Sequence, residues 1–150
     1  MKQAQAEPNW TPIRPMIYPP LKSVLPEALD WHSLPALPPG ARFAVVAGRP
    51  AERGMYVIRI RVPHGVKLLP HRHPENRIYT VISGVLHAGV GERFNSEAAV
   101  AYPPGSTVLL PSDTPHFQWA RSGEYVAQVM GIGPFGLDYI DWLDDPRSFR

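Results

Sequence analysis

Three histidines stand where their imidazoles can meet around one metal ion. His71 and His73 are two residues apart in a β-rich stretch, so both side chains project from the same face of a strand. His116 begins another β-rich stretch well downstream, directly after a proline-containing turn. Imidazole nitrogens bind zinc-like ions at about 2.0–2.1 Å, so the fold must bring the three rings together. The chain has no cysteine, which leaves His, Asp, Glu and backbone oxygens as the available ligands.

The spacing around these histidines resembles the two conserved motifs of the cupin family. Gly65-x5-His71-x-His73, closed by Gly84, resembles the first motif, and Pro111-x4-His116 resembles the second. The resemblance covers residues 42–136 and implies a small single-domain, RmlC-like member of metal-binding type. It implies an all-β, cupin-type antiparallel β-barrel, a jelly roll or double-stranded β-helix, with a metal inside.

One position departs from the cupin pattern in a way that bears on metal binding. The family has a glutamate ligand four residues after the second histidine, and this chain has Arg77 there. Either three histidines hold the metal alone, or Glu75 reaches in as a fourth ligand, or the metal is lost. The glycine usual in the second motif is also replaced, with Asp113 in the turn before His116.

Arg77 requires an electrostatic partner if a metal is bound. At about 5 Å from a divalent ion and an effective dielectric near 20, a guanidinium repels the ion by about 6–7 kcal/mol. Arg77 can pair with Glu75, turn toward the mouth of the barrel, or bind a substrate carboxylate and act in catalysis. A metal-free pocket in which Arg77 binds an anion is the corresponding alternative.

Three further residues are candidates for roles near the metal. Tyr79 shares the alternating face of Arg77 and can offer a phenol to a ligand, although simple packing also explains it. His87 follows the Gly84 turn, where an inward-facing imidazole would line the pocket and act as an acid or base. We therefore take Arg77, His87 and Tyr79 as candidate catalytic residues. Gln118 shares the face of His116 and is a candidate for orienting a ligand or water.

Short β-rich runs separated by glycine and proline dominate the chain after residue 41. Alternation of polar and apolar residues favours strands that are buried on one face. The predicted strands are Arg42–Ala47, Met55–Val62, Val66–His73, Arg77–Ile82, Val85–Val90, Thr107–Leu110, His116–Ala120 and Tyr125–Ile132. Ser83-Gly84 is predicted to form a tight hairpin turn, and residues 94–100 are predicted to be helical. This many short strands favours a closed barrel or sandwich.

Proline content divides the chain into three parts. Nine of the 19 prolines precede residue 41, which disfavours both helix and central strands there. We interpret residues 1–40 as an extended arm, residues 41–140 as the barrel and residues 141–150 as a polar tail. Because the arm carries large apolar residues such as Trp10, Ile17 and Leu25, it is predicted to pack on the barrel or on a neighbouring subunit. The second arrangement predicts a homodimer.

Composition excludes several classes of partner. The net charge is only +2 and the basic residues are scattered, which argues against nucleic-acid binding. No apolar stretch reaches the ~18 residues of a membrane span, and the N-terminus lacks the apolar core of a signal peptide. The chain is predicted to be cytoplasmic, unless it was trimmed from a secreted parent.

The resemblance and the ligand types together suggest a reaction. Three neutral imidazoles leave coordination positions that suit an anionic oxygen ligand such as a keto, enol or hydroxy acid. We predict one divalent transition metal per chain, with iron favoured and zinc, nickel or manganese as alternatives. The leading function is a dioxygenase-type oxidoreductase acting on a small organic anion. A metal-dependent lyase or isomerase and a non-catalytic binding or sensing cupin are the alternatives.

Overall fold

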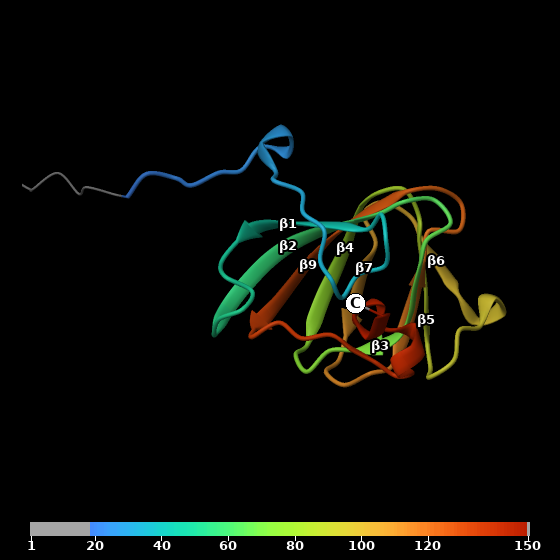
Figure 1. The fold of residues 1–150 in the computed structure, drawn as a ribbon. Coiled ribbons are helices and arrows are strands. Elements are labelled where there is room, and N and C mark those ends of the chain that lie inside the picture. The colour runs from blue at the N-terminus through green and yellow to red at the C-terminus, as the bar shows by residue number, and fades with distance from the viewer. Residues whose placement is uncertain (1–18, 150) are drawn as a thin grey trace, which may run out of the picture.

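Two antiparallel five-stranded sheets face each other across a common interior (Figure 1). The computed structural model describes residues 19–149. The first sheet has the order β1-β2-β9-β4-β7 and the second the order β10-β3-β8-β5-β6. The strand bounds are β1 (Arg42–Ala47), β2 (Gly54–Val62), β3 (Lys67–Arg72), β4 (Arg77–Ser83), β5 (Leu86–Val90), β6 (Val100–Tyr102), β7 (Thr107–Leu110), β8 (His116–Trp119), β9 (Tyr125–Gly133) and β10 (Asp138–Tyr139).

The alternating pattern of the longest strands explains where the core lies. On β2, Tyr56, Ile58, Ile60 and Val62 are buried and their neighbours are more exposed. The paired strand β9 repeats the alternation, and the two strands pair along their whole length. One face of this sheet therefore turns inward and buries apolar side chains against the second sheet, as a half-buried strand requires.

The predicted strands agree with the observed ones, whereas three other sequence interpretations need correction. Strands β6 and β10 were not predicted, because runs this short carry little periodic signal. The expected helix over residues 94–100 is only a 3-10 turn, η2 (Ser96–Ala98). The predicted hairpin at Ser83-Gly84 is wrong, because β4 and β5 belong to different sheets. Gly84 does adopt the left-handed conformation expected of a turn, with φ of 69°, but the turn carries the chain from one sheet to the other.

The second half of the predicted arm contacts the barrel. After the 3-10 turn η1 (Pro26–Ala28), the arm forms a bridge from His32 to Phe43. Leu34 and Leu37 then join the core. The preceding segment is exposed and leads away from the sheets, with Leu21 99% exposed (Figure 1). The homodimer remains a prediction, and Trp10 and Ile17 lie outside the described residues.

The C-terminal tail forms two short 3-10 turns, η3 (Trp142–Asp144) and η4 (Pro146–Phe149). Arg147 anchors this tail by donating to the backbone oxygen of Leu137. Across residues 19–149, no helix has the length and apolar character needed to cross a membrane.

Tyr139 ties the arm to the second sheet, and its removal tests this connection. Its hydroxyl donates to the backbone oxygen of Ala36 at 2.7 Å. We expect Tyr139→Phe to lower the free energy of unfolding by about 1 kcal/mol, the usual contribution of one hydrogen bond. Urea denaturation measures this loss. Faster hydrogen exchange at the Leu37 amide, which bonds to Leu34, should accompany it.

Tyr102→Phe is the matched control, because within residues 19–149 no protein group bonds to the Tyr102 hydroxyl. Equal losses in the two variants would contradict an anchoring role for Tyr139.

Candidate metal centre

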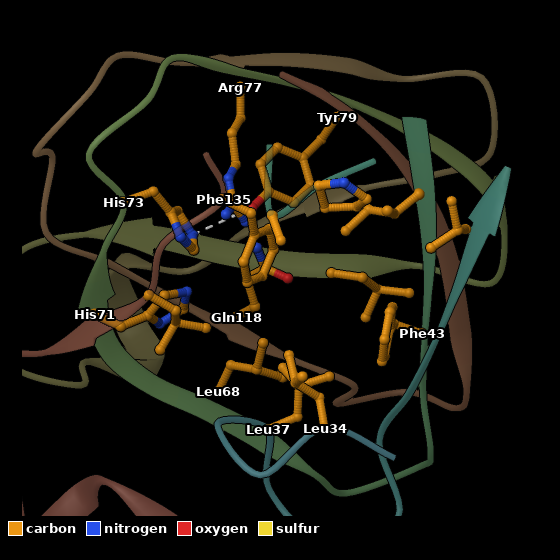
Figure 2. A pocket seen from close by; sticks show the side chains of 16 residues that line it. Leu34, Leu37, Phe43, Leu68, His71, His73, Arg77, Tyr79, Gln118 and Phe135 are labelled. Atoms are coloured by element: carbon orange, nitrogen blue, oxygen red, sulfur yellow. Dashed lines mark hydrogen bonds between the residues drawn. The ribbon is translucent and has the colours of Figure 1, made fainter. Parts of the chain in front are cut away.

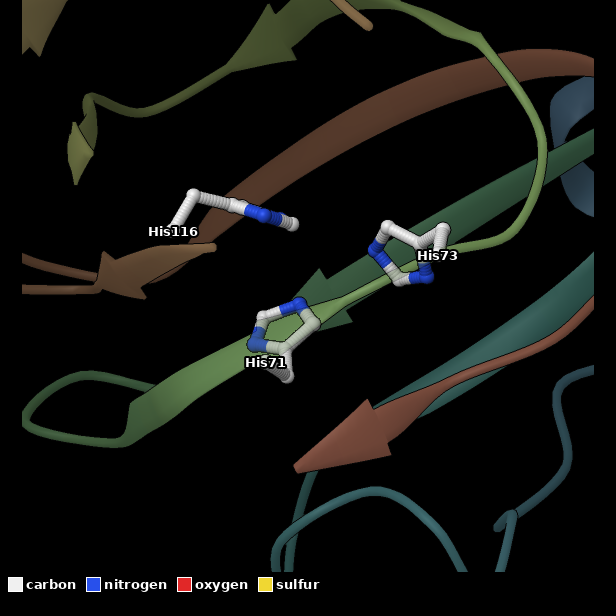
Figure 3. Close-up of side chains that lie close together, drawn as sticks. All are labelled: His71, His73 and His116. Atoms are coloured by element: carbon white, nitrogen blue, oxygen red, sulfur yellow. The ribbon is translucent and has the colours of Figure 1, made fainter. Parts of the chain in front are cut away.

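The three predicted histidines converge inside the barrel (Figure 3). His71 on β3 lies directly opposite His116 on β8, and His73 follows just after the end of β3. Each of the three is at most 4% exposed. One nitrogen from each ring lies within 4.8 Å of the other two. Strands β3 and β8, together with the residue just after the end of β3, therefore place the three imidazoles around one point.

Backbone carbonyls hold all three rings through the same nitrogen. Nδ1 of His71 meets the Leu69 oxygen at 2.7 Å, and Nδ1 of His116 meets the Thr114 oxygen at 2.9 Å. The Nδ1 of His73 meets the Gly136 oxygen at 2.7 Å. Because a carbonyl only accepts, each Nδ1 carries the proton and each Nε2 keeps its lone pair. This is how metal-binding imidazoles are oriented in proteins.

The turn before His116 has the geometry that the second motif requires. Asp113 adopts a left-handed conformation with φ of 57°, which explains why glycine is usual in such a turn. Asp113 is one of the few residue types that tolerate this region. Its amide donates to the backbone oxygen of His73 at 2.7 Å, which links the two parts of the histidine cluster.

Burial keeps the three imidazoles neutral. It lowers the pKa of His71 to about 3, with a further decrease from neighbouring His116. It lowers the pKa of His116 to about 4, with Arg77 adding to the effect. The pKa of His73 is lowered by burial and then by the charge of Arg77. Neutral imidazoles are the form that binds metal.

The donor set fits a divalent transition metal. The Nε2 of His116 is buried and, within the described part of the chain, has no hydrogen-bond partner. A shared ion at about 2.1 Å from each nitrogen needs separations of no more than about 4.2 Å, which is close to the limit of 4.8 Å within which the three nitrogens lie. His71, His73 and His116 would hold such an ion. Imidazole ligands suit zinc, copper, iron and nickel.

Arg77 is buried and paired with Glu75, which is one of the arrangements left open by the sequence. It is 2% exposed, and its Nη2 contacts Glu75 Oε1 at 2.6 Å. Nε donates to the same oxygen at 2.9 Å, and Nη2 also donates to the Gly136 oxygen at 3.0 Å. The guanidinium packs 4.5 Å from the ring centroid of Phe135. Arg77 is thus neutralised by the protein itself.

One oxygen of Glu75 is occupied by this network, whereas its Oε2 is buried and has no hydrogen-bond partner among residues 19–149. Tyr56 donates to the same Oε1 at 2.8 Å, so that oxygen accepts from both Tyr56 and Arg77. Among the described residues, the group able to share a metal comprises the three histidines and not Glu75. The structure therefore pairs Glu75 with Arg77, and the alternative in which Glu75 serves as a fourth ligand stays a prediction.

His71, His73 and Arg77 border an apolar cavity of about 350 Å³ (Figure 2). His71 and His73 lie on one side of it and Phe43 on the opposite side. Leu34 and Leu37 of the arm contribute to its wall. The remaining lining residues are Val45, Pro50, Ala51, Ile58, Ile60, Leu68, Tyr79, Gln118, Phe135 and Leu137. Arg77 is the one charged side chain in this lining, and Glu75 neutralises it.

A second cavity of about 150 Å³ lies beyond Tyr79 and Gln118, which line both cavities. His116 lines the smaller cavity, whereas His71 and His73 line the larger one. The Tyr79 hydroxyl lies 3.5 Å from both His73 Nε2 and Arg77 Nη1. The histidine cluster therefore sits where the two cavities adjoin, with Tyr79 and Gln118 beside it.

His87 does not reach this site, contrary to the prediction that it lines the pocket. It pairs with Trp119 across β5 and β8, and the two rings lie 6.5 Å apart. His87 lines neither cavity, whereas its neighbours Leu86 and Ala88 line the smaller one. Successive strand residues point to opposite faces, so His87 lies on the outer face of the sheet. The prediction was wrong because it assigned the inward face of β5 to the residues that alternate with the ones that actually point inward.

Comparison with solved structures identifies the fold. The polyketide cyclase RemF from Streptomyces resistomycificus is similar with a TM-score of 0.70 and 15% identity, over 86% of this chain and 92% of that chain. KdgF from Halomonas sp. is similar with a TM-score of 0.59 and 18% identity, over 75% and 95%. A cupin 2 conserved barrel domain protein from Rhodopseudomonas palustris is similar with a TM-score of 0.56 and 17% identity, over 75% and 79%. No family model and no curated protein matches the sequence. The chain has the cupin jelly-roll fold, as its two motifs predicted.

The histidine cluster yields a direct test by metal content. We expect the purified protein, incubated with zinc and desalted, to retain close to one ion per chain. His71→Ala and His116→Ala should each lose at least 90% of it, because two imidazoles hold zinc far more weakly than three. Elemental mass spectrometry measures the content.

His87→Ala provides the matched control, since it removes a histidine from the outer face and should leave the metal content unchanged. Retention of the ion by both cluster variants would rule out this site.

The buried ion pair yields a second test, by a double-mutant cycle. Arg77→Met leaves the Glu75 charge buried without a cation and should cost about 3–5 kcal/mol of unfolding free energy. We expect Glu75→Gln combined with Arg77→Met to recover at least half of that loss, because no charge is then buried. Urea denaturation of the four proteins measures the coupling. Additive losses would show that the two residues do not act as a pair.

Proposed function

We propose that this cupin-fold protein is a metal-dependent enzyme that acts on an apolar small molecule bearing carbonyl or enol oxygens. The observation that carries the proposal is the position of the histidine cluster. Three neutral imidazoles with unprotonated Nε2 atoms meet beside a cavity of about 350 Å³ whose wall is otherwise almost entirely apolar. Such a cavity, with a few convergent polar groups, is typical of small-molecule sites.

The metal would be held by His71, His73 and His116. When bound, a divalent ion supplies a Lewis acid that polarises a carbonyl or enol oxygen of the substrate. The three carbonyl acceptors at Nδ1 keep the rings oriented, so that the protein provides a preformed site.

The cavity wall indicates the class of substrate. Leu34, Leu37, Phe43 and Leu68 require an apolar body, and a naphthalene-sized ring system matches the available volume. Because Glu75 already neutralises Arg77, the part of the wall formed by residues 19–149 offers no free cation for a carboxylate. A negative group on the substrate would be met by the charge of the metal. This shifts the expected ligand from a small polar anion toward a larger apolar molecule with a few oxygens.

Tyr79 is the residue best placed for proton transfer. Its hydroxyl lies 3.5 Å from His73 Nε2 and lines both cavities, so it is within reach of a molecule bound beside the cluster. Arg77 Nη1 donates to the phenol oxygen at 3.5 Å, which helps to hold the hydroxyl in this position. We therefore propose non-redox proton-transfer chemistry, such as enolisation, cyclisation or elimination. The likeness to a polyketide cyclase supports this reaction class.

The dioxygenase and the sensing cupin remain predictions that differ from this proposal in measurable ways. A dioxygenase consumes oxygen and depends on a redox-active metal such as iron, whereas proton-transfer chemistry also proceeds with redox-inactive zinc and needs no oxygen. A sensing cupin binds its ligand without turnover.

An exchange reaction tests the proposal without knowledge of the natural substrate. The ketone 2-tetralone has exchangeable protons next to its carbonyl and fits the cavity by size. We expect the zinc-loaded protein, kept anaerobic in D₂O, to accelerate deuterium uptake at these positions, as followed by NMR. Tyr79→Phe should slow the catalysed rate about 100-fold, the usual contribution of a general acid or base.

His87→Ala should exchange at the wild-type rate. Exchange no faster than with free zinc would contradict the proposal. Oxygen uptake by the iron-loaded protein, and not by the zinc-loaded protein, would favour the dioxygenase.

A further inference from the structure

Gln118 is a buried amide held in one orientation at the junction of the two cavities. It is 3% exposed and lies two residues after His116 on β8, on the same inward face. The hydroxyl of Tyr125 donates to its Oε1 at 2.7 Å. Figure 2 shows Gln118 among the side chains that surround the larger cavity, and it lines the smaller one as well.

The bond from Tyr125 determines which end of the amide faces the cavities. Tyr125 is fully buried, and burial raises the pKa of its hydroxyl well above the usual value, so it remains a protonated donor. With Oε1 accepting from Tyr125, the amide nitrogen is the end left for a ligand. Within residues 19–149, that nitrogen has no hydrogen-bond acceptor.

The amide nitrogen is open to the cavity space and not sealed in the core, so an acceptor on a ligand bound there can take its hydrogen bond. The strand pairing keeps the amide in place, because Gln118 lies opposite Leu68 on β3 and Ala88 on β5. Neither neighbour competes for the amide nitrogen.

We propose that Gln118 donates a hydrogen bond to a carbonyl or hydroxyl oxygen of the substrate, and that Tyr125 acts as its positioning residue. The inference deepens the proposed function and rests on it, because it takes these cavities as the substrate site. The substrate would then carry at least two oxygen functions on an apolar body, one at the histidine cluster and one at Gln118. A site built to donate this bond discriminates against analogues that lack the oxygen.

The test compares two probes that differ in one oxygen, using the full chain freed of metal with a chelator. The ketone 2-tetralone carries a carbonyl, and its hydrocarbon analogue tetralin does not. The measured quantity is the ratio of their dissociation constants, obtained by NMR titration in wild type and variants. In Gln118→Met we expect the dissociation constant of 2-tetralone to rise roughly five- to tenfold relative to that of tetralin. This is the usual effect of one lost hydrogen bond.

Two further variants separate the donor from simple packing. Gln118→Glu keeps an acceptor for Tyr125 and has no donor once its carboxyl group is ionised. At a pH where it is ionised, this variant should lose the same preference even if the methionine variant fails to fold. Tyr125→Phe should reduce the preference partially and leave the affinity for tetralin unchanged. In wild type, the side-chain amide signal of Gln118 should shift with 2-tetralone and not with tetralin.

Gln128→Met is the matched control, because Gln128 accepts from Arg59 and lines neither cavity. An unchanged ratio in both Gln118 variants, an equal change in the control, or no binding of either probe to wild type would each overturn the role of Gln118.

Addition of zinc separates this inference from the proposed function. Zinc should lower the dissociation constant of 2-tetralone and leave that of tetralin unchanged. If zinc has no effect but the Gln118 preference persists, the role of the metal fails while the role of Gln118 stands.

Discussion

The contact between Glu75 and Arg77 sets the electrostatics of the whole interior. An unpaired guanidinium close to the histidine cluster would oppose a divalent ion, and an unpaired carboxylate would be equally costly to bury. At 2.6 Å the two charges cancel, and Tyr56 and the Gly136 backbone satisfy further positions of the pair. The cluster can therefore consist of neutral imidazoles alone, and the cavity beside it can remain apolar.

Gly136 connects this ion pair to the metal centre. Its backbone oxygen accepts from Arg77 Nη2 and also lies 2.7 Å from His73 Nδ1. The same carbonyl thus orients one imidazole and anchors the guanidinium. Because this carbonyl contacts both the His73 ring and Arg77, it couples the geometry of the histidine cluster to that of the cavity wall. In that wall the Arg77 guanidinium packs on the Phe135 ring.

The interior combines an apolar enclosure with polar groups at one junction. Leucines from the arm help to enclose the larger cavity, and the histidines, Tyr79 and Gln118 meet where it adjoins the smaller one. Substrate binding in such a site relies on burial of an apolar body for affinity and on a few directed hydrogen bonds for orientation. Carbonyl acceptors at the imidazoles and the Tyr125 hydroxyl at Gln118 keep these directions fixed before any ligand arrives.

The sequence by itself determined the eight longer strands and the histidine set, because both rest on local spacing. Alternation along residues 54–62 and 125–133 defines which face is buried, and the His-x-His spacing places two imidazoles on one face. Three features required the tertiary structure: the pairing of Arg77 with Glu75, the outward direction of His87, and the amide of Gln118 held by Tyr125. Each depends on which strands become neighbours and on the facing of single residues. A register shift of one residue reverses that facing without changing the local pattern.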